Sequence, residues 1–509
     1  MTGTISKVVI AGGGTAGWMT AAALSRFLVP SGVTVELVES EQIGTVGVGE
    51  ATIPGIIDFN RMLGIDEADF IAATKGTFKL GIEFVDWDRV GNRYLHPFGE
   101  YGFDLEGVPF HHYWLRDRLR GSDHPLSAYS MCCQAAMSGK FMRPVSDPQS
   151  PVAQMRHAYH FDAGLYARYL RNYAEQRGVT RVEGRIKTVD QSTETGSLTA
   201  LELENGSRVE GDIFVDCTGF RALLIGETLG VAYDDWRRYL PCDRAIAVPC
   251  EKIGAAAPYT RATAREAGWQ WRIPLQHRTG NGYVYSSAFL DDDEAESALL
   301  ANLDAPTTGP TNRLRFTPGR RRTVWKKNCV AIGLSAGFLE PLESTSIHLI
   351  QEGVSKLLAL FPRGGINQRE VTRYNSIIGN AYDYVRDFLI LHYNATTRDD
   401  TPFWDYVRTM AVPDSLTETV ELFAENGRFF AHKSDLFSIT SWVAVMIGQG
   451  ILPRGYDPVA DSIPDQDLVA TLTNMREIYA QAASKMPPHQ AFIDHLAKSA
   501  RQGGQAHAR

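Results

Sequence analysis

The stretch Lys7-Val8-Val9-Ile10-Ala11-Gly12-Gly13-Gly14-Thr15-Ala16-Gly17, residues 7–17, decides how this chain folds. Its first five residues are short and apolar enough for a buried strand, and they run directly into three glycines. Residues 15–27 have helix-forming composition without proline, and residues 33–38 form a second strand pattern that ends at Glu39. Two strands joined by a helix in this way are parallel, so the pattern predicts a sheet covered on both faces.

The spacing Gly12-x-Gly14-x-x-Gly17 is typical of a dinucleotide site. Gly12 permits the tight turn, Gly14 lets the backbone approach a pyrophosphate, and Gly17 allows close contact between helix and strand. The helix N-terminus offers free N–H groups and a positive dipole to the phosphates. Glu39, at the end of the second strand, is placed to accept hydrogen bonds from a ribose diol. The alternative is that the glycines only shape a turn.

Distant parts of the chain favour FAD over NAD as the dinucleotide. A long insertion separates the first strand–helix–strand unit from a strand that ends at Thr218-Gly219, and another strand-then-glycine segment occurs at 329–337. Several distant segments that converge on one cofactor suit a large, elongated ligand. A simple dehydrogenase would complete its second mononucleotide half at once and would be shorter.

The remaining pattern predicts an α/β core followed by helices. Asn205-Gly206 is a hairpin signal between strand patterns at 198–204 and 207–215. Beyond about residue 347, stretches such as 349–361, 371–391 and 465–485 carry helical periodicity. We expect an α/β + α fold. Residues 1–346 would form an FAD-binding, Rossmann-like core with inserted substrate-facing segments, and residues 347–509 a mostly helical lobe that completes the substrate pocket.

Composition excludes several classes of function. The chain has 509 residues, of which 44% are hydrophobic and 22% charged, and its formal net charge is −8, so it is globular and nucleic acid is not expected as its ligand. Six cysteines form no CxxC and suit a reducing cytosol. No apolar run is long enough to span a membrane. Histidines, as in His157-x-x-His160, lack the spacing of a metal site, so no metal is predicted. These points predict a cytoplasmic protein.

Eight segments, the glycine motif among them, make the chain recognisable. It resembles the flavin-dependent halogenases of the tryptophan-halogenase family, themselves related to flavin monooxygenases, and the matches run in one order along nearly the whole chain. The matching segments are GGGTAGW at 12–18, GVGEATIP at 47–54, TFKLGIEFVDW at 77–87, HPFG at 96–99, YHFDA at 159–163, GWQWRIP at 268–274, PLESTSIHLI at 341–350 and RDFLILHY at 386–393.

The resemblance implies a flavin monooxygenase-like core and a division of labour. A separate flavin reductase delivers FADH2, which reacts with O2 to give a flavin hydroperoxide, and halide (chloride or bromide) attacks it to make hypohalous acid. This species passes through an internal tunnel to a lysine beside the aromatic substrate, by motif position Lys79. Its ammonium would polarise the halogen or form a haloamine, and Glu343 would remove the ring proton. The alternatives are a solvated surface lysine and a helix-capping glutamate.

The resemblance also assigns the binding residues. The backbone N–H groups of Thr345 and Ser346 would bind halide, although Ser346 stands where the tryptophan-specific pattern has glycine. Trp269 and Trp271 would form a wall near the flavin or, alternatively, plain core. The residues expected to contact FAD are Gly12, Gly14, Thr15, Ala16, Gly17, Glu39, Val48, Ala51, Ile186, Leu334 and Ile347. Those expected to contact the substrate are His96, Phe98, Ser344 and Trp442.

The substrate expected from the sequence is indole or an indole derivative rather than free tryptophan. The region that clamps the amino acid in tryptophan-specific relatives corresponds here to residues 439–453, with Ser441-Trp442 in place of paired tyrosines. Burying a zwitterion without polar partners is costly. Two other hypotheses stay open: a flavin-dependent aromatic hydroxylase reduced directly by NAD(P)H, and a non-catalytic flavin-binding scaffold. The sequence leaves regioselectivity, halide preference, the reductase and a homodimeric state open.

Overall fold

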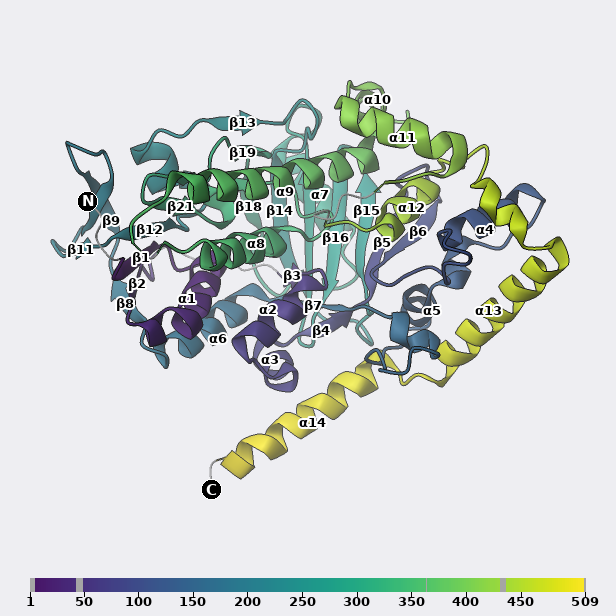
Figure 1. Cartoon of the computed structure of the whole chain (residues 1–509), viewed down its shortest axis with the longest axis horizontal. Coiled ribbons are helices and arrows are strands. Elements are labelled where there is room, and N and C mark those ends of the chain that lie inside the picture. Colours follow the sequence, from purple (N-terminus) through teal and green to yellow (C-terminus); the bar gives the residue numbers. More distant parts are fainter. Residues whose placement is uncertain (1–4, 43–48, 363, 431–435, 508–509) are drawn as a thin grey trace. The chain divides into compact units, whose positions relative to one another are not determined.

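The computed structural model describes residues 5–42, 49–362, 364–430 and 436–507 (Figure 1). The chain divides into two compact units, each drawn from three segments. The first unit contains residues 1–75, 161–238 and 315–383, and the second contains the rest. The division predicted at residue 346 stays a prediction. The mixed α/β fold itself is confirmed.

A six-stranded sheet with helices packed on it forms the core of the first unit. Its central strand β1 pairs in parallel with β12 on one side and β2 on the other, and residues 8–11 of β1 are fully buried. Only β20, at one edge, is antiparallel. In sheet order the strands are β20 (Trp325–Lys326), β21 (Cys329–Ala331), β12 (Ile213–Asp216), β1 (Lys7–Ala11), β2 (Thr34–Glu39) and β8 (Thr180–Glu183).

Helix α1 follows β1 directly and packs against α6 and α8 (Figure 1). All five residues of β1 and the first three residues of α1 lie in the opening stretch 7–17, and both elements have the bounds that the sequence predicts. The helices of this unit are α1 (Thr15–Phe27), α2 (Gly55–Leu63), α3 (Glu67–Thr74), α6 (Ala163–Glu175) and α8 (Ser346–Ala359), and α9 (Gln368–Asn394) continues into the second unit. Its other strands are β3 (Gly49–Ala51), β9 (Ile186–Gln191), β10 (Leu198–Leu203), β11 (Arg208–Glu210), β13 (Tyr233–Asp235), β19 (Gly319–Arg321) and β22 (Gly337–Phe338).

The hairpin predicted at Asn205-Gly206 is present, but its second strand is shorter than expected. β10 pairs antiparallel with β11, which ends at Glu210, and a separate strand β12 starts at Ile213. The predicted strand is interrupted at Gly211, where a Cβ would come within 2.7 Å of the Val9 side chain. The next residue, Asp212, accepts hydrogen bonds from the N–H groups of Ser6 and Lys7, which fixes the start of β1.

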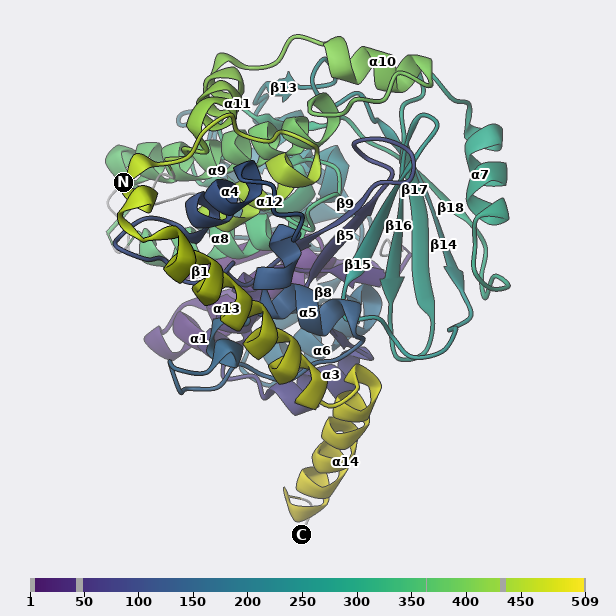
Figure 2. The same cartoon turned by 90° about the vertical axis from the view of Figure 1, so that its right-hand side faces the viewer.

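A seven-stranded sheet dominates the second unit (Figure 2). The pairs β14–β17, β17–β16, β16–β15 and β5–β6 are antiparallel, and β15 and β5 are parallel. Helix α7 packs against β14 and β17. In sheet order the strands are β18 (Asn312–Arg315), β14 (Arg244–Cys250), β17 (Thr279–Tyr285), β16 (Gly268–Pro274), β15 (Thr260–Arg265), β5 (Gly81–Val85) and β6 (Arg93–Pro97).

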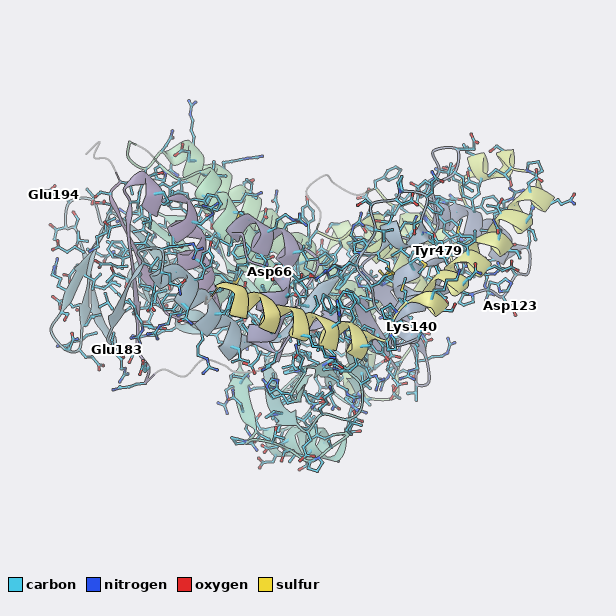
Figure 3. All side chains as sticks on the ribbon, turned by 90° about the horizontal axis from the view of Figure 1, so that it is seen from below. Asp66, Asp123, Lys140, Glu183, Glu194 and Tyr479 are labelled. Carbon is cyan, nitrogen blue, oxygen red and sulfur yellow. The ribbon has the colours of Figure 1, made fainter. Side chains whose placement is uncertain are left out.

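A second, small pairing in this unit carries the predicted catalytic lysine. The three-residue strand β4 (Thr77–Lys79) pairs antiparallel with the first residues of β7 (Ala158–Asp162). The helices of the unit are α4 (Phe110–Leu119), α5 (Met131–Met137), α7 (Asp292–Ala301), α10 (Pro402–Thr409), α11 (Asp414–Asn426), α12 (Ile439–Gly448), α13 (Asp465–Lys485) and α14 (His489–His507). Tyr479 of α13, labelled in Figure 3, donates to Gln154 Oε1, which ties this helix to the unit.

Candidate functional site

The glycine-rich turn between β1 and α1 has the geometry that a pyrophosphate needs. Gly12 has φ +105°, and a Cβ there would lie 2.3 Å from the carbonyl oxygen of Cys217. Gly14 is the N-cap of α1, no side chain of the described residues caps the helix, and a Cβ on Gly14 would meet nothing within 4 Å. The first-turn N–H groups of α1 therefore face open space, which fits an anionic ligand.

Glu39 lies beside this turn, as the sequence predicts. Its carboxylate accepts from Arg181 Nε at 2.6 Å and from Trp18 Nε1 at 3.3 Å, and Arg171 lies 3.6 Å away. A Cβ on Gly13 would overlap the Glu39 carboxylate. The sequence did not reveal the two arginines, because they come from α6 and β8 and carry no local motif. Their charges hold the carboxylate in place next to the ribose position that the motif implies.

The other residues predicted to contact FAD are partly brought together. The turn Gly333–Ser335, which holds Leu334, lies against α1, since a Cβ on Gly333 would come within 2.7 Å of Ala16 Cβ. α8, which holds Ile347, packs on α1. Gly184, two residues before Ile186, donates its N–H to the Glu39 carbonyl. Ala51 is buried on β3, and Val48 lies outside the described residues.

The predicted base and halide residues lie at the start of α8 in the first unit. Glu343 is fully buried, and Ser344 has φ +59°, which is unusual for a residue other than glycine. Thr345 is the N-cap, and α8 begins at Ser346, again without a side-chain cap among the described residues. The N–H groups of this turn are free of intrahelical partners and carry the positive end of the helix dipole. The turn is therefore suited to a small anion.

Lys79 lies in the second unit, at the end of β4. Its side chain is fully buried, and its Nζ lies 5.0 Å from the centre of the Phe98 ring, so the two predicted residues are in cation–π contact. Phe98 is fixed in turn, because its N–H donates to the Leu80 carbonyl at 2.9 Å. A buried ammonium against an aromatic face is desolvated, which strengthens its interaction with a ligand oxygen.

A chain of hydrogen bonds runs beside Lys79 on the same face of β4. Thr77 Oγ1 donates to the Pro274 carbonyl at 2.7 Å, so it accepts from His160 Nδ1 at 3.0 Å. His160 Nε2 then accepts from Thr260 Oγ1 at 2.9 Å. Burial, followed by the charges of Lys79 and His489, holds the pKa of His160 well below its usual value. The imidazole is neutral, which leaves the lysine as the cation of this face.

Aromatic side chains surround two of the predicted substrate residues. His96 of β6 lies 5.8 Å from Phe388 and 6.4 Å from Phe437, measured between ring centres. Trp442 of α12 lies 5.0 Å from Phe388 and stacks on Phe429 at 5.1 Å. His96 and Trp442 thus belong to one aromatic cluster. Ser344, the fourth predicted substrate residue, lies in the first unit.

The two tryptophans of β16 have different surroundings. Trp269 is buried and lies 6.3 Å from Trp87, whose ring contacts Tyr393 and Trp404, and its place near the flavin stays a prediction. Trp271 lies opposite Gly282, which leaves room for the indole because a Cβ there would come within 2.1 Å of it. The Trp271 Nε1 is buried and has no hydrogen-bond partner among the described residues.

Two residues that the sequence analysis did not single out also have unusual surroundings. Burial, followed by the nearby Asp162 charge, raises the pKa of Glu50 to about 7. Glu50 lies within the 47–54 segment, so its place in a matched motif was the available signal. On α8, Gln351 is buried, and its Nε2 has no partner among the described residues. No sequence pattern marks Gln351.

Among the described residues, no cluster of His, Cys, Asp and Glu could hold a metal ion. The helices of the same part of the chain are all too short or too polar to cross a membrane.

Comparison with known proteins agrees with this geometry. The model of the tryptophan halogenase family matches residues 7–465. The structure of Xcc4156, a flavin-dependent halogenase from Xanthomonas campestris, is 49% identical with a TM-score of 0.94, covering 97% of this chain and 98% of that one. BrvH, a flavin-dependent halogenase from Brevundimonas sp. BAL3, is 46% identical with a TM-score of 0.93, covering 97% and 99%. Tryptophan 6-halogenase SttH of Streptomyces toxytricini is 38% identical over 478 residues, 88% of this chain and 90% of that protein.

The fold, the dinucleotide turn and these similarities define the class of protein: an FADH2-dependent oxidoreductase of the halogenase type. The chain belongs to the tryptophan-halogenase family. Flavin-dependent halogenases use FADH2 that a separate flavin reductase supplies, together with halide and O2. The hydroxylase alternative is not favoured. The roles predicted for individual residues stay predictions.

Proposed function

We propose that this enzyme halogenates an uncharged, electron-rich aromatic ring, with indole or an indole derivative preferred over free tryptophan. The observation that carries the proposal is the buried Lys79 ammonium, held against Phe98 in the unit whose aromatic cluster contains the predicted substrate residues His96 and Trp442. Reduced FAD, with O2 and halide, supplies hypohalous acid. Side chains of this protein then carry out the transfer of halogen to the ring and the removal of the ring proton.

In the proposed reaction, Lys79 Nζ donates a hydrogen bond to the hypohalite oxygen and polarises the halogen toward the ring. The bond between oxygen and halogen breaks as the bond between ring carbon and halogen forms. The oxygen leaves as water after it takes a proton from Lys79, and Glu343 accepts the proton that the ring carbon loses. The two residues then exchange that proton through solvent. A desolvated carboxylate also stabilises the cationic ring before deprotonation.

The residues proposed to hold FAD and halide are consistent with the same proposal. Gly14 and the uncapped start of α1 would hold the pyrophosphate, and Glu39 would hold the ribose. Thr345 and Ser346 would hold halide through backbone N–H groups at the start of α8. We also propose a cytoplasmic enzyme, because the six cysteines are buried free thiols.

The substrate preference follows from the composition of the aromatic cluster. Phe388, Phe429, Phe437 and Trp442 offer apolar surface and ring faces, which suit indole. The Glu100 carboxylate accepts a hydrogen bond from Thr440 Oγ1 of α12. Thr440 is two residues before Trp442, so it lies about 200° around the helix from it. The ring faces of this cluster offer no charge to the ammonium and carboxylate of free tryptophan, and burying those groups against rings alone is costly.

The test is mass spectrometry of an aromatic panel after incubation with the enzyme, a flavin reductase, O2 and mixed halides. Indole should carry halogen with a higher kcat/KM than tryptophan. A preference for tryptophan would contradict the substrate proposal, and hydroxylated product without halogen would contradict the reaction itself.

A further inference from the structure

The strand that carries Lys79 is held along one edge by a side chain from the far end of the chain. The backbone N–H of Phe78 donates to Nε2 of His489 at 3.1 Å. His489 Nδ1 lies 2.8 Å from the carbonyl oxygen of Ala256. Because a carbonyl oxygen only accepts, Nδ1 carries the proton and Nε2 is the acceptor that Phe78 requires. The side chain of His489 is 1% exposed.

The backbone around His489 is held by hydrogen bonds as well, so the position from which the imidazole extends is fixed. The His489 N–H donates to the Gly139 carbonyl at 2.9 Å, and the Phe141 N–H donates to the Pro487 carbonyl at 3.2 Å. Lys140, labelled in Figure 3, lies between these two bonds and donates to the end of α13. The chain that enters α14 is therefore docked before the helix begins.

Phe78 is held by its ring too. The ring stacks on Phe141 with 4.2 Å between centres and meets Phe492 of α14 edge-on at 5.3 Å. Successive side chains of a strand point to opposite faces, so Phe78 faces this aromatic group while Lys79 faces the other side. Fixing the backbone and ring of Phe78 therefore fixes the point and direction at which the Lys79 side chain leaves the strand.

We propose that His489 is a positioning residue for Lys79, acting through the Phe78 backbone. The inference rests on the proposed role of Lys79 and extends it to a residue 411 positions away from Phe78 along the chain. A reacting group displaced by about 1 Å loses on the order of a hundredfold in rate. β4 has only three residues, so a single lost hydrogen bond removes a large part of what holds it. Burial lowers the pKa of His489 to about 4, which keeps Nε2 an acceptor near neutral pH.

The proposal is tested by how the enzyme divides its oxidant between ring product and solution. His489→Phe keeps an aromatic ring but removes the acceptor for Phe78. We expect ring product per FADH2 to fall about tenfold or more, while hypohalous acid captured by added monochlorodimedone rises to match. In His489→Gln, the amide can accept from Phe78 and donate to Ala256, so the ratio should return toward that of the wild type.

Two controls make the result decisive. Leu496→Ala removes a buried side chain from the same helix about two turns further on, and it should lower the melting temperature without changing the ratio. Lys79→Ala in the same assay tests the role on which the inference rests: if it still makes ring product, the proposed function fails. If Lys79→Ala abolishes ring product while His489→Phe keeps the wild-type ratio, only the positioning role fails. The positioning role is also contradicted if Leu496→Ala changes the ratio as His489→Phe does. It is contradicted as well if His489→Gln has the low ratio of His489→Phe.

Discussion

The glycine-rich turn of the first unit and the Lys79 strand of the second are built in different ways. The turn is made of backbone, its residues are contiguous, and its predicted function depends on the absence of side chains at Gly12 and Gly14. The predicted function of the strand depends on side chains, and its hydrogen-bond partners His160 and His489 come from distant parts of the chain. A backbone site is therefore disturbed by adding an atom, whereas a side-chain site is disturbed by losing a partner.

Among variants of the first unit, the largest effect should come from Glu343, whose side chain is the proposed base. Glu343→Gln keeps the shape of this buried side chain but removes its basicity. We expect kcat for ring halogenation to fall on the order of a hundredfold or more, with FAD affinity unchanged. The measurement is product formation under saturating FADH2 and halide. Glu340→Gln is the matched control, also fully buried, and should lose far less. Equal losses would remove Glu343 from the mechanism.

Alanine substitution should affect the two glycines of the turn differently, in FAD affinity and in stability. Gly14→Ala introduces a Cβ that meets no atom of the described protein within 4 Å, but that atom occupies the space a pyrophosphate would approach. We expect the FAD dissociation constant to rise about tenfold, roughly 1.4 kcal/mol, with the melting temperature of the apoprotein unchanged. Titration of flavin fluorescence and thermal melting give the two values.

Gly12→Ala is the contrasting variant, because it combines φ +105° with a contact of 2.3 Å to the Cys217 carbonyl oxygen. It should lower the stability of the apoprotein as well as FAD affinity. If Gly14→Ala were the variant that unfolds, or if it bound FAD as the wild type does, the assignment of the turn would be wrong.

The last effect concerns stability in acid and leaves activity near neutral pH unchanged. The pKa of His489 is about 4 in the folded protein against 6.5 in the unfolded chain, so between these pH values the unfolded chain binds more protons. The free energy of unfolding therefore falls as the pH falls, by about 3 kcal/mol at this site between pH 7 and pH 4. His489→Gln lacks this loss. Urea unfolding at the two pH values should show the variant gaining on the wild type in acid, and a constant difference would contradict the shift.

Local patterns were sufficient to predict the first unit's opening elements. The five residues of β1 and the helix after it have the predicted bounds, because an apolar strand followed by glycines has few other structures available. The strand pattern 207–215 was misleading, because the break at Gly211-Asp212 depends on contacts with Ser6 and Val9, about two hundred residues away. His489 could not be predicted either, because one histidine on a polar helix has no signal until the fold brings it to Phe78.

The resemblance supplied what periodicity could not. Lys79 and Phe98 were chosen from motifs, and the structure places them in contact within one unit. Glu343, Thr345 and Ser346 were chosen in the same way and lie together at the start of α8. The arginines on Glu39 and the raised pKa of Glu50 needed coordinates, since charge and burial at a residue are set by neighbours from other elements.

The central claim is that Lys79 delivers the halogen to the ring. Its most direct test is the amount of ring-halogenated indole formed per FADH2 by Lys79→Ala and by the wild type, at equal flavin occupancy. The claim predicts that the variant consumes FADH2 and releases hypohalous acid that monochlorodimedone captures, with almost no halogenated indole. Halogenated indole at the wild-type yield would contradict it.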